Sequence, residues 1–360
     1  MLFGDIMNVT RIALTGAPCS GKTTVINYLK MHYESKNYFV AVMPECAREV
    51  IKSGFPRDDM YAFEKAVIER QIQREEQIEL HLKNENCENA IVLYDRGIAD
   101  AFSYLNKAQS DKMKKHFNTD FIKIWSRYDA AVMLELPSNS YYLKDCERYE
   151  SYEQALINQD RLLDAWVGHP HFRVVGSCDD IEEKVKGVIA EIDCILSNIE
   201  HEIKYLIEYP DIDELKKYKI FKTDIEQIYL LSDTGSHRIR KRGAGSSFCC
   251  FENVKIRISG DKCHEYESVI SPEKYNELKA LADPKKHPIV KNRYCLLYEN
   301  QYFELDVFPF WSDRALLELE LSRDGQTINL PPEINVIKDV SKSKKYKNNY
   351  LASVNFNEDC

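Results

Sequence analysis

The feature that most constrains this chain is the glycine-containing stretch at residues 16–24, which follows a short apolar run near the start of the sequence. The apolar run spans residues 12–14, and an amphipathic stretch follows at 25–33. A strand, a tight loop and a helix in this order let backbone N–H groups and a helix N-terminus surround a phosphate. The stretch is a complete P-loop (Walker A) sequence. It predicts nucleotide binding by Gly16, Ala17, Pro18, Cys19, Ser20, Gly21, Lys22, Thr23 and Thr24.

Two side chains of this loop have further predicted roles. The lysine of a P-loop meets the β- and γ-phosphate oxygens, and the hydroxyl after it ligates Mg²⁺. Lys22 is therefore a catalytic candidate as well as a binding residue, and Thr23 is a candidate metal ligand.

Apolar and helical segments alternate through the first half. Strands are expected at 39–43, 90–94, 130–136 and 172–175, with a long helix at 59–84 and a closing helix at 181–196. Strands separated by helices predict a parallel sheet covered on both faces, with ligands at the carboxyl ends of its strands. Glu45 follows the strand at 39–43, and Asp95 and Arg96 follow the strand at 90–94, which are the second and third strands when the run at 12–14 is counted as the first. An acid after the third strand can hold Mg²⁺ through water.

Residues 8–195 resemble the nucleoside and nucleotide kinase group of P-loop proteins, which includes the deoxynucleoside, thymidylate and nicotinamide-riboside kinases. The resemblance implies that Glu45 is a catalytic base or acceptor contact, that Asp95 is catalytic and binds metal, and that Arg96 binds phosphate. It also implies a lid arginine, for which Arg148 and Arg161 are the candidates. The alternative for Glu45 is an acid that merely begins a helix, and the phosphate acceptor is unspecified.

The second half has a different pattern, in which charged residues recur at a spacing of two within β-like segments. Such spacing places both members of a pair on one face of a strand. The pairs are Glu200/Glu202, Arg238/Arg240, Lys255/Arg257, Glu265/Glu267, Lys291/Arg293, Glu304/Asp306 and Glu318/Glu320. A wet sheet face usually mixes signs, because neighbouring like charges repel. Acidic and basic strands around a central ligand, bases on phosphate and acids on a cation, explain the segregation better.

From Glu200 to about Ala352 the order of these segments is similar to the CYTH, or triphosphate tunnel metalloenzyme, family, whose opening signature is Glu-x-Glu-x-Lys. The resemblance implies a closed barrel that binds a triphosphate and a metal. The implied triphosphate-binding residues are Lys204, Arg238, Arg240, Lys255, Arg293 and Lys338. The implied metal ligands, in addition to Thr23 and Asp95 of the first half, are Glu200, Glu202, Glu304, Asp306, Glu318 and Glu320.

The length of 360 residues favours two domains, and we expect them at 8–196 and 197–360. The expected fold is an α/β P-loop domain with a parallel sheet, followed by a mainly antiparallel β-barrel (tunnel) α+β domain. A net charge of −9 argues against nucleic acid as the main partner. No run of apolar residues is long enough for a transmembrane segment, and a signal peptide is not apparent, so a cytoplasmic location is expected.

The combined order resembles the TRPL translocation defect protein family. It supports an enzyme that hydrolyses a triphosphate in the tunnel and uses the P-loop domain as an NTPase or kinase. The expected cofactors are Mg²⁺ or Mn²⁺ with ATP or GTP, and the expected partner is a triphosphate-bearing small molecule. Two alternatives stay open: a non-catalytic module that binds nucleotides and phosphorylated ligands, and an adenylyl cyclase.

Overall fold

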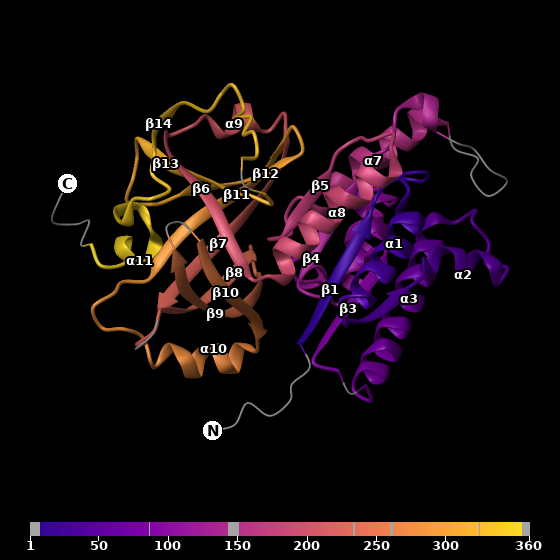
Figure 1. Ribbon diagram of the computed structural model, residues 1–360, viewed down its shortest axis with the longest axis horizontal. Coiled ribbons are helices and arrows are strands. Elements are labelled where there is room, and N and C mark those ends of the chain that lie inside the picture. Colours follow the sequence, from indigo (N-terminus) through magenta and orange to yellow (C-terminus); the bar gives the residue numbers. More distant parts are fainter. Residues whose placement is uncertain are drawn as a thin grey trace. The chain divides into compact units, whose positions relative to one another are not determined.

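The computed structural model describes residues 8–85, 87–142, 151–232, 235–259, 262–323 and 325–354. The chain forms two compact units, which divide between Glu191 and Ile192. Figure 1 shows the first unit as a sheet with helices and the second as a curved sheet with few helices. Among the described residues, no helix has the length and apolar character needed to cross a membrane.

The first unit is built on a five-stranded parallel sheet with the order β2-β3-β1-β4-β5. Every residue of β4 and all but the first of β3 are buried, as expected for strands covered on both faces. The elements are β1 (Asn8–Thr15), α1 (Lys22–Glu34), β2 (Phe39–Met43), α2 (Cys46–Lys52), α3 (Met60–Leu82), β3 (Asn89–Asp95), α4 (Ile98–Ser103), α5 (Lys107–His116), α6 (Phe121–Trp125), β4 (Ala130–Leu134), the 3₁₀ helix η1 (Asn139–Tyr141), α7 (Tyr152–Trp166), β5 (Phe172–Val175) and α8 (Ile181–Leu196).

The parallel sheet expected from the sequence is confirmed, although one of its strands is shorter than expected. The strand expected to continue to residue 136 ends at Leu134. Beyond it, the backbone N–H of Leu136 donates to the side chain of Gln159 at 2.7 Å instead of to a neighbouring strand.

The second unit is an antiparallel barrel. Its strands follow the order β10-β9-β8-β7-β11-β12-β13-β6-β14, and an additional pairing of β10 with β6 closes eight of them into a ring. The elements are β6 (Ile199–Glu208), α9 (Ile212–Leu215), β7 (Lys219–Tyr229), β8 (Ser236–Ala244), β9 (Ser247–Ser259), β10 (Lys262–Ile270), α10 (Pro272–Lys279), β11 (Ile289–Tyr298), β12 (Gln301–Val307), β13 (Arg314–Glu320), β14 (Val336–Asp339), the 3₁₀ helix η2 (Lys344–Tyr346) and α11 (Asn348–Leu351). The expected barrel class is confirmed, whereas the exposed β14, which lacks alternating hydrophobicity, was not predicted.

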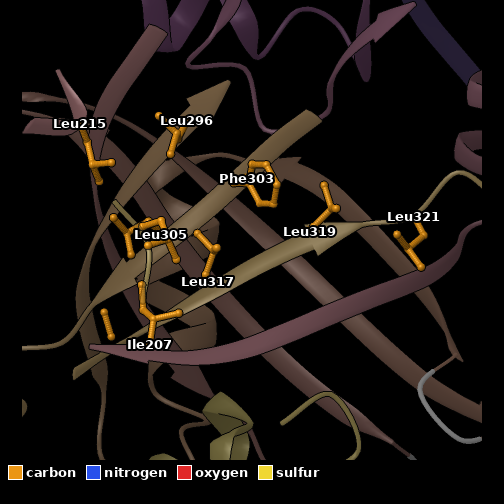
Figure 2. Packing of buried hydrophobic residues seen from close by; sticks show 10 residues of the cluster. Ile207, Leu215, Leu296, Phe303, Leu305, Leu317, Leu319 and Leu321 are labelled. Carbon is orange, nitrogen blue, oxygen red and sulfur yellow. The ribbon is translucent and has the colours of Figure 1, made fainter. Parts of the chain in front are cut away.

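The main apolar core of this unit lies on the outer face of the strands. Figure 2 shows this cluster, in which Phe303 and Leu305 of β12 pack beside Leu317 and Leu319 of β13. Ile334, in the segment after β13, belongs to the same core. Because successive side chains of a strand point to opposite faces, the charged residues between these apolar ones point into the ring.

Two further clusters complete the barrel. On the outer face of β8, Ile239 packs with Tyr275 and Leu278 of α10. At the other cluster, the inward-facing Leu206 and Leu316 pack with residues that include Leu351 of α11 and Ala352. The barrel therefore has apolar packing outside the ring and around α11, while much of its interior is left to charged side chains.

Candidate functional site

The first candidate site is the loop between β1 and α1. Gly16, Cys19 and Gly21 all have positive φ, and a Cβ at Gly16 would lie 2.6 Å from the carbonyl oxygen of Leu134. Only glycine fits at residue 16, because both its backbone and its surroundings exclude a side chain. Helix α1 begins at Lys22 without a side-chain cap, so its first N–H groups face the loop and can bind an anion.

Lys22 is buried beneath this loop. Its ammonium donates to the carbonyl oxygens of Gly16 at 2.6 Å and Ala17 at 3.1 Å. Burial and the nearby Arg96 lower the pKa of Lys22 to about 8. The lysine thus lies in the loop expected to hold the phosphates, while Thr23 and Thr24 are exposed at the start of α1.

The carboxyl ends of β2 and β3 bring Glu45 and Arg96 together, as the parallel sheet predicts. Arg96 donates from Nε to Glu45 Oε1 at 2.8 Å and from Nη1 to Asp100 Oδ2 at 3.0 Å, and Arg48 donates to Glu45 Oε2 at 2.7 Å. Burial raises the pKa of Glu45, but Arg96 and Lys22 outweigh it and bring the pKa to about 2. Glu45 is thus ionised and ion-paired through both oxygens, which makes it a weak proton acceptor.

Asp95 is the buried acid at the end of β3. Its Oδ1 atom is enclosed and has no hydrogen-bond partner in the described part of the chain. Burial also raises the pKa of Asp95. An unsatisfied carboxylate oxygen at this place fits a Mg²⁺-bound water, because a buried acceptor without a donor is costly.

Lys184 of α8 was missed by the sequence reasoning. Its ammonium donates to the carbonyl oxygens of Ser20 at 3.3 Å and Glu135 at 2.9 Å, which links α8 to the phosphate loop and to the end of β4. Burial lowers the pKa of Lys184. Nothing local marks this lysine, since it follows two glutamates in an ordinary charged helix. Of the expected lid residues, Arg161 is exposed on α7 and Arg148 lies outside the described residues.

The second candidate site is the interior of the barrel, where one group of side chains forms what we call the acid sector. It combines the carboxylates of Glu202, Glu304, Asp306 and Glu318 with the cations of Lys204, Lys291 and Arg293. Lys204 lies 2.8 Å from Glu318 and 3.4 Å from Glu202. Burial lowers the pKa of Lys204, but these two carboxylates outweigh it and raise the pKa.

Arg293 is the centre of this sector. It lies 2.7 Å from Asp306 and 3.1 Å from Glu318, and it also pairs with Glu304. Burial raises the pKa of Glu318, but Lys204 and Arg293 hold it well below its ordinary value. Asp306 also receives the ammonium of Lys291, so both of its oxygens are engaged.

A second group, which we call the cation sector, lies on β8, β9 and β10. It contains the cations of Arg238, Arg240 and Lys255, the carboxylates of Glu265 and Glu267, and the amide of Asn253. Each of the five charged side chains is less than one fifth exposed. The strands hold these groups together because Lys255 pairs in register with Glu265, and Asn253 with Glu267.

Three of the barrel residues predicted to bind metal or phosphate are not assigned to either sector. Glu320 pairs in register with Glu202 at the end of β13, the side chain of Glu200 lies outside the described residues, and Lys338 is exposed on β14. Within the described ranges, no group of three or more His, Cys, Asp or Glu side chains is placed to hold a metal ion. Carboxylates do suit Mg²⁺ or Mn²⁺ as ligands, so the metal site stays a prediction.

The chain is similar to several known proteins. A family model described as an AAA domain matches residues 11–184. The inorganic triphosphatase NE1496 is 28% identical, with 43% of this chain and 95% of that chain covered and a TM-score of 0.31. The Hippeastrum protein HpAC1, described as having a dominant triphosphatase activity, is 17% identical over 34% of this chain and 80% of its own, with a TM-score of 0.27.

The PH1012 protein from Pyrococcus horikoshii OT3 is 20% identical, with the same coverage of 34% and 80% and a TM-score of 0.28. No curated protein matches the chain.

Proposed function

We propose that the second unit hydrolyses a triphosphate inside its barrel with the help of Mg²⁺ or Mn²⁺, and that the first unit binds ATP or GTP as an NTPase or small-molecule kinase. In this proposal the domains are residues 8–196 and 197–360. The order of the two domains along the chain resembles that of the TRPL translocation defect protein family.

The barrel proposal rests on one observation, which is that the ring has its main apolar core outside and charged side chains inside. The apolar core packs outside the strands, whereas buried lysines, arginines and carboxylates face inward. Burying so many charges is costly unless they serve a ligand or one another. A polyphosphate with a divalent cation supplies both signs of charge that such an interior needs.

In the proposed reaction, Arg238, Arg240 and Lys255 bind the phosphate oxygens and orient the chain of phosphates. Lys204 and Arg293 extend the set of cations toward the acid sector. The carboxylates of Glu200, Glu202, Glu318 and Glu320 would hold the cation, and when bound it would polarise a phosphoryl oxygen and activate water. The protein's own contribution is to position these groups and to neutralise the charge on the phosphates.

In the first unit, the loop N–H groups and Lys22 bind the β- and γ-phosphates. Thr23 and Asp95 would hold Mg²⁺, Thr23 directly and Asp95 through water. Arg96 keeps Glu45 ionised beside the site, where Glu45 can accept a hydrogen bond from an acceptor hydroxyl.

The test is to incubate the purified chain with Mg²⁺ or Mn²⁺ and tripolyphosphate, thiamine triphosphate, ATP or GTP. Orthophosphate release that Arg240→Ala abolishes and Lys22→Ala spares supports hydrolysis in the barrel. Pyrophosphate with cyclic AMP indicates a cyclase instead. Tight binding of these compounds without turnover indicates a non-catalytic binding module.

A further inference from the structure

The two carboxylates of the cation sector, Glu265 and Glu267, have no part in the proposed chemistry, and both lie on β10. Glu265 accepts from Arg238 at 2.9 Å and pairs with Lys255 at 2.9 Å. Glu267 accepts from Arg240 at 3.3 Å. The three cations of the cation sector are therefore all paired with carboxylates of β10.

Asn253 locks this arrangement. Its Nδ2 atom donates to Glu267 at 3.3 Å and also to Glu265. An amide between two carboxylates must turn its NH₂ group toward them, because its oxygen would be repelled. The carboxylates are thus held in place by a neutral residue as well as by the cations.

The balance of charge distinguishes this sector from the acid sector. Here three cations, Arg238, Arg240 and Lys255, face two carboxylates. In the acid sector three cations face four carboxylates. Because positive charge is in excess in the cation sector, we expect the phosphates to lie against β8 and β9. Glu265 and Glu267 of the neighbouring β10 belong to the same sector.

We propose that Glu265 and Glu267 are built-in anions that occupy the phosphate-binding cations of the empty barrel and must be displaced by the substrate. Their negative charge opposes every anion that enters, so a ligand binds only if its contacts exceed those of two carboxylates. The device selects anions with at least three phosphoryl groups over pyrophosphate and orthophosphate. This inference rests on the proposed function, since it names what the same barrel selects.

The pairs also have a role in the empty protein. Without Glu265 and Glu267, three cations on neighbouring strands would repel one another in a poorly solvated space. Burial lowers the pKa of Arg240, Arg238 lowers it further, and Glu267 and Glu265 oppose this effect. Neutralising the two carboxylates should therefore weaken the empty fold and strengthen anion binding at the same time.

The experiment compares the wild-type chain with Glu265→Gln/Glu267→Gln and with the single variant Glu267→Gln. The matched control is Glu252→Gln, because Glu252 lies on the outer face of β9 and pairs with His237 at 2.8 Å. Thermal melts and titration calorimetry are done with tripolyphosphate, pyrophosphate and orthophosphate, each with and without Mg²⁺.

The expected result has two parts. The double variant melts at a lower temperature than the wild type when empty, and its Kd for tripolyphosphate falls by about tenfold, the scale of a lost charge-assisted contact. The gap between the Kd values of pyrophosphate and tripolyphosphate narrows, and Glu252→Gln changes neither quantity. Glu267→Gln gives the same signs with smaller size, and it decides the matter should the double variant not fold.

Other results would overturn the inference. Unchanged or weaker tripolyphosphate binding in a folded variant would make these residues structural, and a loss of binding only in the presence of Mg²⁺ would make them metal ligands. A wild-type chain that binds none of the three phosphates would instead refute the proposed function itself.

Discussion

Arg96, directly after β3, donates a hydrogen bond from Nε to the carboxylate of Glu45, which lies after β2, at 2.8 Å. The backbone of Arg96 has a φ of 78°. A non-glycine residue in this region is strained by about 1–2 kcal/mol. The strain is maintained because the same guanidinium also reaches Asp100, which accepts in turn from Thr15 at 2.8 Å and Trp166 at 2.7 Å. The pair is thus fixed from several sides at the place where we expect the phosphate acceptor.

The first prediction concerns acid stability. Glu45 has a folded-state pKa of about 2 against an ordinary value of 4.5, so its charge stabilises the fold above about pH 4.5 and this contribution is lost as the pH falls toward 2. The difference corresponds to about 3 kcal/mol. Denaturant unfolding of wild type and Glu45→Gln should differ most at pH 6, and the difference should shrink below pH 4.5 and vanish only as the pH falls below about 2. A difference that is independent of pH would show that the ion pair does not set it.

The second prediction concerns Lys22. Lys22→Ala should weaken ATP binding to the first unit by roughly 2–4 kcal/mol, because a charge-assisted contact in a desolvated loop is lost. Calorimetry in an Arg240→Ala background removes binding by the barrel. Lys30→Ala is the control, since Lys30 lies on the same helix in an exposed pair with Glu34. Equal affinities would refute the loop as the nucleotide site.

The third prediction separates Asp95 from Glu45. Asp95→Asn should reduce turnover in the first unit by about 100-fold with every acceptor, since the group that organises Mg²⁺ is neutralised. Glu45→Gln should spare slow hydrolysis by water, because only the acceptor contact is lost. Phosphate release by each variant, in the Arg240→Ala background, checks both statements. Wild-type turnover in Asp95→Asn would remove this residue from the site.

The fourth prediction concerns Glu318. Glu318→Gln should abolish metal-dependent triphosphate turnover and also destabilise the barrel by about 3 kcal/mol, because removing one partner leaves Lys204 and Arg293 undercompensated. Phosphate release and denaturant unfolding measure the two effects, with the outward-facing Glu252→Gln as control. Full activity in a folded variant would contradict the tunnel mechanism.

The sequence predicted what depends on neighbours along the chain. The loop from Gly16 to Thr24 is expected to bind phosphate through consecutive backbone groups, and its glycines mark it without reference to the rest of the fold. The paired charges at a spacing of two likewise predicted inward-facing strand faces, since alternation is a property of every strand. Both domain classes followed from these local patterns.

The tertiary structure alone decided which charges meet. Arg96 and Glu45 are 51 residues apart, and Lys184 reaches Ser20 from a helix 164 residues later. In the sequence, nothing distinguishes Glu265 and Glu267 from the other acidic pairs. In the fold, β10 pairs with β9 and β9 pairs with β8, and this arrangement places the two carboxylates beside Arg238 and Arg240. A spacing pattern gives the face of a strand, whereas strand order and register set its partners. These are fixed by long-range pairing and packing, which a single local pattern does not encode.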